Sequence, residues 1–316
     1  MSSIFNPEFL QVSSGEVIDA IKRDGCFYFE NAIQKNICNL IINDLSSNKI
    51  NINENDVHGV FYNDQYFHTH IMASSKSGFD LLTSNTLLDI CDDYLASQYR
   101  LRSQRYYETY DSHKMQWHTD NKTPGKIDKI FDHPGLIFIF YMVDVNDGEF
   151  EYIKGSHEWS YKTGKNNFTD KEITDEYSNK IIQFKMPKGS VAICDARGIH
   201  RAHPIRKKGF IRKSIYFQVD ARVDNAEKIL LNSEFLDSID SRKASYLGLG
   251  VNANYPHYPP SNESTLSMND SIRFVGKTFR GAIFNRFKRA FDLLPQKLSW
   301  KIKLQIKKIF FNKIKK

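Results

Sequence analysis

Between about residues 99 and 220 the sequence carries a series of short segments rich in β-branched and aromatic residues. The clearest are YRLRSQRYYETY, LIFIFYMV, IIQFK, SVAICD and KSIYFQV. Turn-forming sequences such as Asp147-Gly148 and Pro187-Lys188-Gly189 separate them, which is typical of β-strands joined by tight connections. Several such strands in succession predict a barrel or a double-sheet roll with helices packed outside.

The sequence before this region alternates helical and strand signals. EVIDAIKRDG predicts a short helix closed by Gly25, CFYFEN predicts a strand, and NICNLIINDL predicts a second helix. Helical spacing of apolar residues also runs from Asp80 to Ala96. We therefore expect a mainly β domain with flanking helices at residues 1–250, with its strand-rich core at about 99–222.

Composition excludes several classes of protein. The longest uninterrupted apolar run, Leu136 to Val143, is far shorter than the ~20 residues that a membrane-spanning helix needs. MSSIFNPEFL lacks a basic region followed by an apolar block, which argues against a secretory signal. The four cysteines are scattered without a CxxC pair, which argues against a disulfide scaffold or a zinc ribbon. These features favour a cytoplasmic protein.

The positive charge of the chain is concentrated at its end. Residues 272–316 hold 14 Lys and Arg against one acid, Asp292, so the rest of the chain has a net charge of −6. NANYPHYPPSNEST, within 251–270, has the composition of a linker, and the basic tail at 271–316 has amphipathic spacing. Cationic amphipathic segments with Phe and Trp suit anionic membranes, so we predict peripheral contact with the inner face of the membrane.

Two other uses of the tail stay open. It could dock on its own domain or on a protein partner. Nucleic acid is a less favoured partner, because the sequence shows no structured basic groove with stacking aromatic residues.

Metal-binding chemistry is first suggested by His118 and Asp120 in QWHTD. Residues two apart on a strand project from the same face, so an imidazole and a carboxylate placed in this way can hold one metal ion from one side. An HxD pair alone is a common accident of sequence. The pair therefore needs a third ligand before it predicts a site.

His200 in CDARGIHRAHP supplies that ligand, because it follows the strand SVAICD directly. Two imidazoles and one carboxylate form the facial triad that binds non-haem Fe(II) and leaves positions open for O₂. Zinc sites with the same ligand types exist, so ligand type alone does not fix the metal. His203 is the competing third ligand, but it precedes Pro204 in a predicted turn.

Arg212 opens the strand RKSIYFQV, twelve residues after His200. A guanidinium that points into a barrel needs a carboxylate partner, and its bidentate fork matches a dicarboxylate such as 2-oxoglutarate. Ser214 shares the face of Arg212 and offers a hydroxyl contact, whereas Lys213 faces the other way.

These motifs together carry a family resemblance. QWHTD, LIFIFYMVDVNDGEFEYIKGSHEWSY, MPKGSVAICDARGIHRAHP and FIRKSIYFQ follow one another in an order that resembles the phytanoyl-CoA dioxygenase (PhyH-like) family of Fe(II)/2-oxoglutarate-dependent oxygenases. The resemblance spans about residues 15–225. It implies a double-stranded β-helix, of jelly-roll or cupin type, as the fold.

The resemblance also implies roles for single residues. His118, Asp120 and His200 would be the catalytic residues that ligate iron, and Arg212 would anchor the distal carboxylate of 2-oxoglutarate. The implied cofactors are Fe(II), 2-oxoglutarate as co-substrate and O₂, with ascorbate as an optional reductant. In some members a small hydroxyl residue two positions after the distal His contacts the co-substrate; here Ala202 stands there, and we expect Ser214 or Tyr106 to compensate.

The predicted activity is hydroxylation of a small or lipid- or carrier-linked metabolite, with decarboxylation of 2-oxoglutarate to succinate. Related halogenases replace the carboxylate ligand with a small residue, so Asp120 favours hydroxylation over halogenation. Desaturation and epimerisation stay open. The alternatives are a nucleic-acid demethylase of the same superfamily and a non-catalytic metal-binding barrel protein.

Overall fold

The computed structural model describes residues 3–47, 59–62, 65–111, 113, 115–124, 130–159, 167–221, 226–251 and 279. The chain divides into two units, residues 1–262 and 263–316. Apart from residues 251 and 279, the predicted linker at 251–270 and the predicted basic tail at 271–316 lie outside the described residues. The fold described below is that of the first unit.

Six helices and three short strands come before β4 in the described part of the chain. These elements are α1 (Pro7–Leu10), α2 (Ser14–Asp24), β1 (Cys26–Phe29), α3 (Lys35–Leu45), β2 (Val60–Tyr62), β3 (Gln65–His68), α4 (Ile71–Ser74), α5 (Lys76–Leu82) and α6 (Asn85–Leu95). The elements that follow are β4 (Arg100–Thr109), β5 (Trp117–His118), β6 (Lys122–Pro124), β7 (Ile130–Asp132), β8 (Gly135–Tyr141), β9 (Val145–Ile153), β10 (Asn167–Phe168), α7 (Asp170–Tyr177), β11 (Ile181–Met186), β12 (Val191–Asp195), β13 (His200–Ala202), β14 (Arg212–Asp220) and α8 (Ser241–Leu247).

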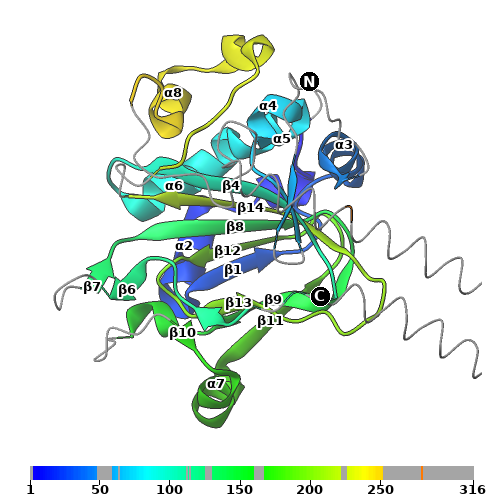
Figure 1. Cartoon of the computed structure of the whole chain (residues 1–316). Coiled ribbons are helices and arrows are strands. Elements are labelled where there is room, and N and C mark those ends of the chain that lie inside the picture. The colour runs from blue at the N-terminus through cyan, green and yellow to red at the C-terminus, as the bar shows by residue number, and fades with distance from the viewer. Residues whose placement is uncertain are drawn as a thin grey trace, which may run out of the picture. The chain divides into compact units, whose positions relative to one another are not determined.

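Two antiparallel sheets form the body of this unit. The larger sheet has the strand order β1-β12-β8-β14-β4-β3-β2, and the smaller sheet has the order β10-β5-β13-β9-β11. Figure 1 shows the two sheets as separate layers, with α3, α4, α5 and α6 over the outer face of the larger sheet. This arrangement confirms the predicted mainly β fold with flanking helices.

Side chains of the larger sheet alternate between two environments. In β8, Leu136, Phe138 and Phe140 belong to the core beneath the helices, whereas Ile137 and Ile139 pack toward the smaller sheet. Because both faces of this strand are covered, the run LIFIFYMV is apolar throughout instead of alternating with polar residues. Burial on both faces makes β8 a rigid support for the strands beside it.

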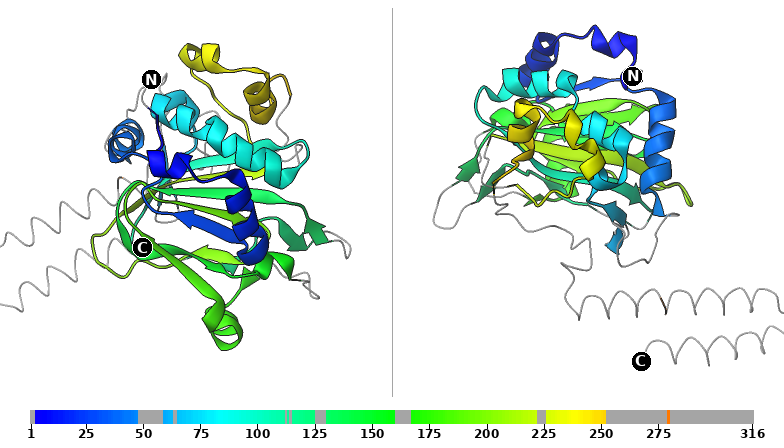
Figure 2. Two further views of the ribbon diagram at one scale, coloured as in Figure 1. Left: turned by 180° about the vertical axis from the view of Figure 1, so that it is seen from behind. Right: turned by 90° about the horizontal axis from the view of Figure 1, so that it is seen from above.

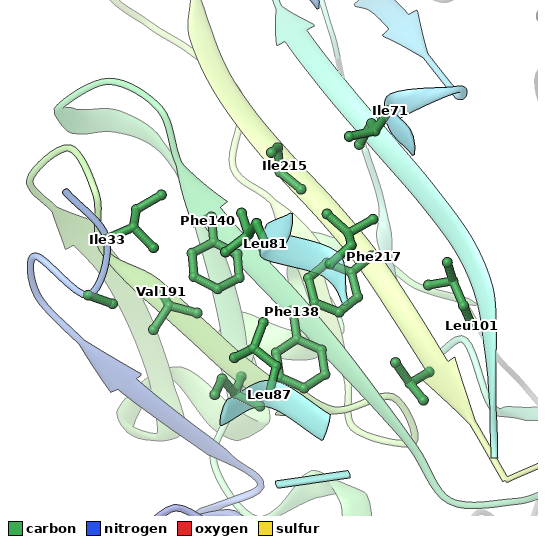
Figure 3. Packing of buried hydrophobic residues seen from close by; sticks show 14 of the residues in the cluster. Ile33, Ile71, Leu81, Leu87, Leu101, Phe138, Phe140, Val191, Ile215 and Phe217 are labelled. Carbon is green, nitrogen blue, oxygen red and sulfur yellow. The ribbon is translucent and has the colours of Figure 1, made fainter. Parts of the chain in front are cut away.

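The core beneath the helices joins the larger sheet to residues from α2 to α6 (Figure 2). Figure 3 shows the aromatic centre of this core, where the rings of Phe138 and Phe217 stack with their centroids 4.6 Å apart. Leu81 and Leu87 reach this core from α5 and α6. Burial of these apolar side chains stabilises the packing of β14, the strand that carries Arg212, against the helices.

The helical segment predicted from Asp80 to Ala96 is two helices. α5 ends at Leu82 and α6 begins at Asn85. Ser84 has an extended backbone as the N-cap of α6, and the Thr83 hydroxyl donates to the carbonyl of Phe79, four residues back. Ser and Thr compete for backbone hydrogen bonds in this way, so the break follows from residues that apolar spacing does not register.

All four cysteines are free, in agreement with their scattered spacing, and all four are buried. Of the helices in the described part of the chain, none has the length and apolar character needed to cross a membrane.

Candidate metal centre

Adjacent strands of the smaller sheet bring the predicted metal ligands together. His118 ends β5, His200 begins β13, and the two residues are direct partners in the antiparallel register. Their imidazole centroids lie 4.4 Å apart. Asp120 follows His118 by two residues, and its backbone N–H donates to the carbonyl of Ala196, in the turn before His200 (3.1 Å).

The three side chains converge on one point. The Nε2 atom of His118 lies 3.6 Å from Oδ1 of Asp120, and the Nε2 atom of His200 lies 3.7 Å from Oδ2. The potential ligand atoms of all three residues lie within 4.8 Å of one another. Such separations suit three ligands on one face of a single metal ion.

Hydrogen bonds to the backbone orient both imidazoles. Nδ1 of His118 lies 2.9 Å from the carbonyl of Gln116, and Nδ1 of His200 lies 3.0 Å from the carbonyl of Gly198. A carbonyl can only accept, so each Nδ1 carries the proton and each Nε2 presents its lone pair to the centre. This outer-shell arrangement is the one that metal-binding histidines use.

The electrostatics of the site also suit a cation. Burial, followed by the nearby His118, lowers the pKa of His200 to about 4, so this imidazole is neutral at neutral pH. Burial by itself would raise the pKa of Asp120, but His200, His118 and Arg102 outweigh it and the pKa is lowered. The site therefore offers a neutral imidazole at His200 and a carboxylate at Asp120, the protonation states that metal binding requires.

The turn from Asp195 to Gly198 holds both halves of this centre. The carbonyl of Ala196 accepts from Asp120, and the carbonyl of Gly198 accepts from His200. A Cβ atom on Gly198 would overlap the Tyr152 hydroxyl, which itself donates to the carbonyl of Asp195 (3.1 Å). Only glycine fits beneath this tyrosine.

We therefore expect Gly198→Ala to lower the free energy of unfolding by about 2 kcal/mol, since overpacking a buried site has a cost of this size. It should also weaken metal binding by displacing the turn. Chemical denaturation and metal titration measure the two effects. Gly15→Ala is the control, because a Cβ there would approach only the Ser13 hydroxyl, at 3.9 Å. Equal stability of the two variants would contradict the role given to the turn.

A cavity of about 310 Å³ opens beside the three ligands. Arg212, Ser214, Tyr216 and Gln218 line it from alternate positions of β14, and Tyr107 and Arg105 line it from β4. The structure thus brings Arg212 and Ser214 into one cavity with His118, Asp120 and His200. Lys213 points the other way and pairs with Glu108 at 2.9 Å.

Arg212 is a buried cation in need of an anion. Its side chain donates to the carbonyl of Gly148 and to the hydroxyl of Thr109, and it forms no ion pair with any described residue. Burial lowers its pKa, since the guanidinium has lost its hydration and the nearby Tyr141, Tyr107 and Glu149 offset that loss only in part. An unpaired buried charge is costly, so this position favours a carboxylate ligand in the cavity.

One predicted residue, Tyr106, and the rejected competitor His203 lie elsewhere. Tyr106 faces the helices and donates to Glu108 (3.1 Å), and it does not line the cavity. This corrects its expected contact with the co-substrate: the parity of β4 brings Tyr107 into the cavity instead. His203, the competing ligand, lies apart from the centre and pairs with Glu151 (3.2 Å).

Several cavity residues had escaped the sequence analysis. Tyr216 and Gln218 share the face of Arg212, so the period of two along β14 could have found them. Arg105 and Glu227 are 122 positions apart in the sequence and form a buried ion pair, with Nη1 of Arg105 2.7 Å from Oε2 of Glu227. No local sequence pattern predicts this pair.

The fold and the site together define a class, the double-stranded β-helix proteins with a His-Asp-His centre, which is that of the Fe(II)/2-oxoglutarate-dependent dioxygenases. Residues 94–214 match the model of the family Phytanoyl-CoA dioxygenase (PhyH). This segment is similar to that family of dioxygenases, as its motifs indicated.

Solved structures agree on the fold. HygX from Streptomyces hygroscopicus, with nickel and 2-oxoglutarate bound, is 14% identical, with a TM-score of 0.55 over 69% of this chain and 91% of its own. HygX with nickel, 2-oxoglutarate and hygromycin B bound is 13% identical, with a TM-score of 0.53 over 79% and 99%. No curated protein matches the chain in sequence.

Proposed function

We propose that this protein hydroxylates a small, polar molecule with Fe(II), 2-oxoglutarate and O₂, and releases succinate and CO₂. The observation that carries this proposal is Arg212, a buried cation without a described acidic partner, in the same cavity as His118, Asp120 and His200. The His-Asp-His donor set fits Fe(II), and the guanidinium fits the distal carboxylate of the co-substrate. The bound 2-oxoglutarate in HygX supports this pairing of fold and co-substrate.

When bound, the iron and 2-oxoglutarate supply the oxidising chemistry, and the protein supplies geometry. His118 and His200 present fixed Nε2 lone pairs, and Asp120 adds the negative charge. Arg212 orients the co-substrate from the first residue of β14, with Ser214 as a hydroxyl contact on the same face. Ile139 and Tyr141 from β8 and Phe150 from β9 give the cavity an apolar lining.

The charged wall of the cavity favours a polar substrate. Arg105 is the register partner of Tyr216 on the neighbouring strand, so it stands beside the metal ligands and away from Arg212, four residues along β14. It forms a buried pair with Glu227, and each side chain is 6% exposed. Hydroxyl or amino groups of a substrate can bond to this pair, whereas an acyl chain would meet it without compensation. The Arg105–Glu227 pair therefore disfavours a lipid- or carrier-linked substrate.

The test is succinate formation by anaerobically purified protein supplied with Fe(II), 2-oxoglutarate and then O₂. We expect slow succinate release without substrate and faster release with a suitable polar molecule. Asp120→Ala is the control, because it removes the charged ligand. Stoichiometric iron binding without any succinate would instead favour the non-catalytic barrel protein.

We also propose that residues 272–316 contact an anionic membrane, on the strength of their charge alone. Flotation of the full chain with anionic liposomes should be lost on truncation after Asp270. Steeply salt-dependent binding of DNA or RNA by the same segment would favour the demethylase instead.

A further inference from the structure

The carboxylate of Asp120 needs support from a neighbour. Asp120 lies in the loop after β5, and its backbone is held by the carbonyl of Ala196. Its side chain can still rotate, and binding a metal through one oxygen leaves the other oxygen to be satisfied. Metal-binding carboxylates are commonly fixed by a hydrogen bond of this outer kind.

We propose that Tyr216 is the positioning residue for Asp120, an inference that rests on the proposed function. The Tyr216 hydroxyl donates to Oδ2 of Asp120 across 3.0 Å, from the larger sheet to the smaller one. Among the described residues it makes the one hydrogen bond to this carboxylate, because the Nε2 atoms of the two histidines stand at 3.6 and 3.7 Å.

A buried polar network lies beside Tyr216. Its hydroxyl lies 2.7 Å from Oε1 of Gln218, whose amide nitrogen donates to Asn121 (2.9 Å) and Asp220 (3.0 Å). Arg102 donates to the same two residues, at 2.6 and 3.2 Å. The network fixes the amide of Gln218, and so fixes the oxygen that faces Tyr216.

Competition within this network has a defined outcome. The Tyr216 hydroxyl carries one hydrogen and has two acceptors within reach, Asp120 and Gln218. A carboxylate is a stronger acceptor than a neutral amide oxygen, so the hydrogen goes to Asp120. Tyr216 then sets the rotation of the carboxylate before any metal arrives.

The structure also makes Tyr216→Phe a clean test. The tyrosine ring packs edge-on against Tyr107, with the centroids 6.1 Å apart, and phenylalanine keeps that ring. Only the hydroxyl is lost. The variant should therefore fold with a melting temperature close to that of the wild type, which circular dichroism would measure.

Metal affinity is the decisive readout. We expect Tyr216→Phe to raise the dissociation constant for Co(II), titrated calorimetrically without 2-oxoglutarate, by about 10- to 100-fold. The visible absorption of bound Co(II) should change with it, because the carboxylate is free to turn. Tyr106→Phe is the matched control: it removes a buried hydroxyl from the same sheet, on the face away from the metal, and should leave both readouts unchanged.

The experiment separates a failure of the proposed function from a failure of the positioning role of Tyr216. If the wild type binds no Co(II), the proposed function fails. If the wild type binds Co(II) and Tyr216→Phe matches it in affinity and in spectrum, the proposed function stands and the positioning role is overturned.

Discussion

Replacing Arg212 with leucine is expected to raise the KM for 2-oxoglutarate by about 100-fold, since two charge-assisted hydrogen bonds to a buried carboxylate together contribute about 3 kcal/mol. The metal-free protein should lose little stability, because loss of the hydrogen bonds to Gly148 and Thr109 is offset by removal of a buried cation that forms no ion pair with a described residue. Steady-state succinate formation measures the first effect, and thermal melting with and without 2-oxoglutarate measures the second.

Arg206→Leu is the matched control for this experiment. Arg206 is an exposed arginine six residues earlier. Its backbone N–H donates to Asp147 (2.7 Å), and this bond does not depend on the side chain. Its KM should stay at the wild-type value. An unchanged KM in Arg212→Leu would mean that the co-substrate is anchored elsewhere.

The second large effect concerns the metal ligands. His118→Ala and His200→Ala should each reduce bound Fe(II) from about one ion per chain to a small fraction, and should slow succinate formation by more than the ~100-fold seen for outer-shell changes. Elemental analysis and single-turnover assays at saturating 2-oxoglutarate provide the measurements. Both imidazoles offer a free Nε2 lone pair to the same point, so neither can replace the other.

His203→Ala should keep both the iron and the activity, because His203 pairs with Glu151 apart from the cavity. This variant tests the choice between two histidines only three positions apart. If His203→Ala lost its iron and His200→Ala kept it, the triad described above would be wrong.

The strands could be predicted from the sequence because their residue types are local signals. KSIYFQV alternates between a cavity face and a core face, and the structure keeps that alternation from Arg212 to Gln218. The same logic did not extend to β4, where Tyr106 and Tyr107 are adjacent aromatic residues of equal propensity. The pairing of β4 with its neighbouring strands decides which of the two tyrosines faces the cavity. The register between β4 and β14 also shifts between Gln218 and Val219.

What the sequence by itself determined is the set of chemical groups and their place along the strands: His118 and Asp120 stand two residues apart at the end of a strand, His200 follows a strand, and Arg212 opens one. Only the tertiary structure decided which distant groups meet. Tyr216 reaches Asp120 from another sheet, and Arg105 finds Glu227 beyond the end of β14. The physical reason is that these two properties depend on interactions over different lengths of the chain. Side-chain direction along a strand is set by backbone geometry over two residues, whereas the pairing of buried polar groups is set by the packing of whole sheets.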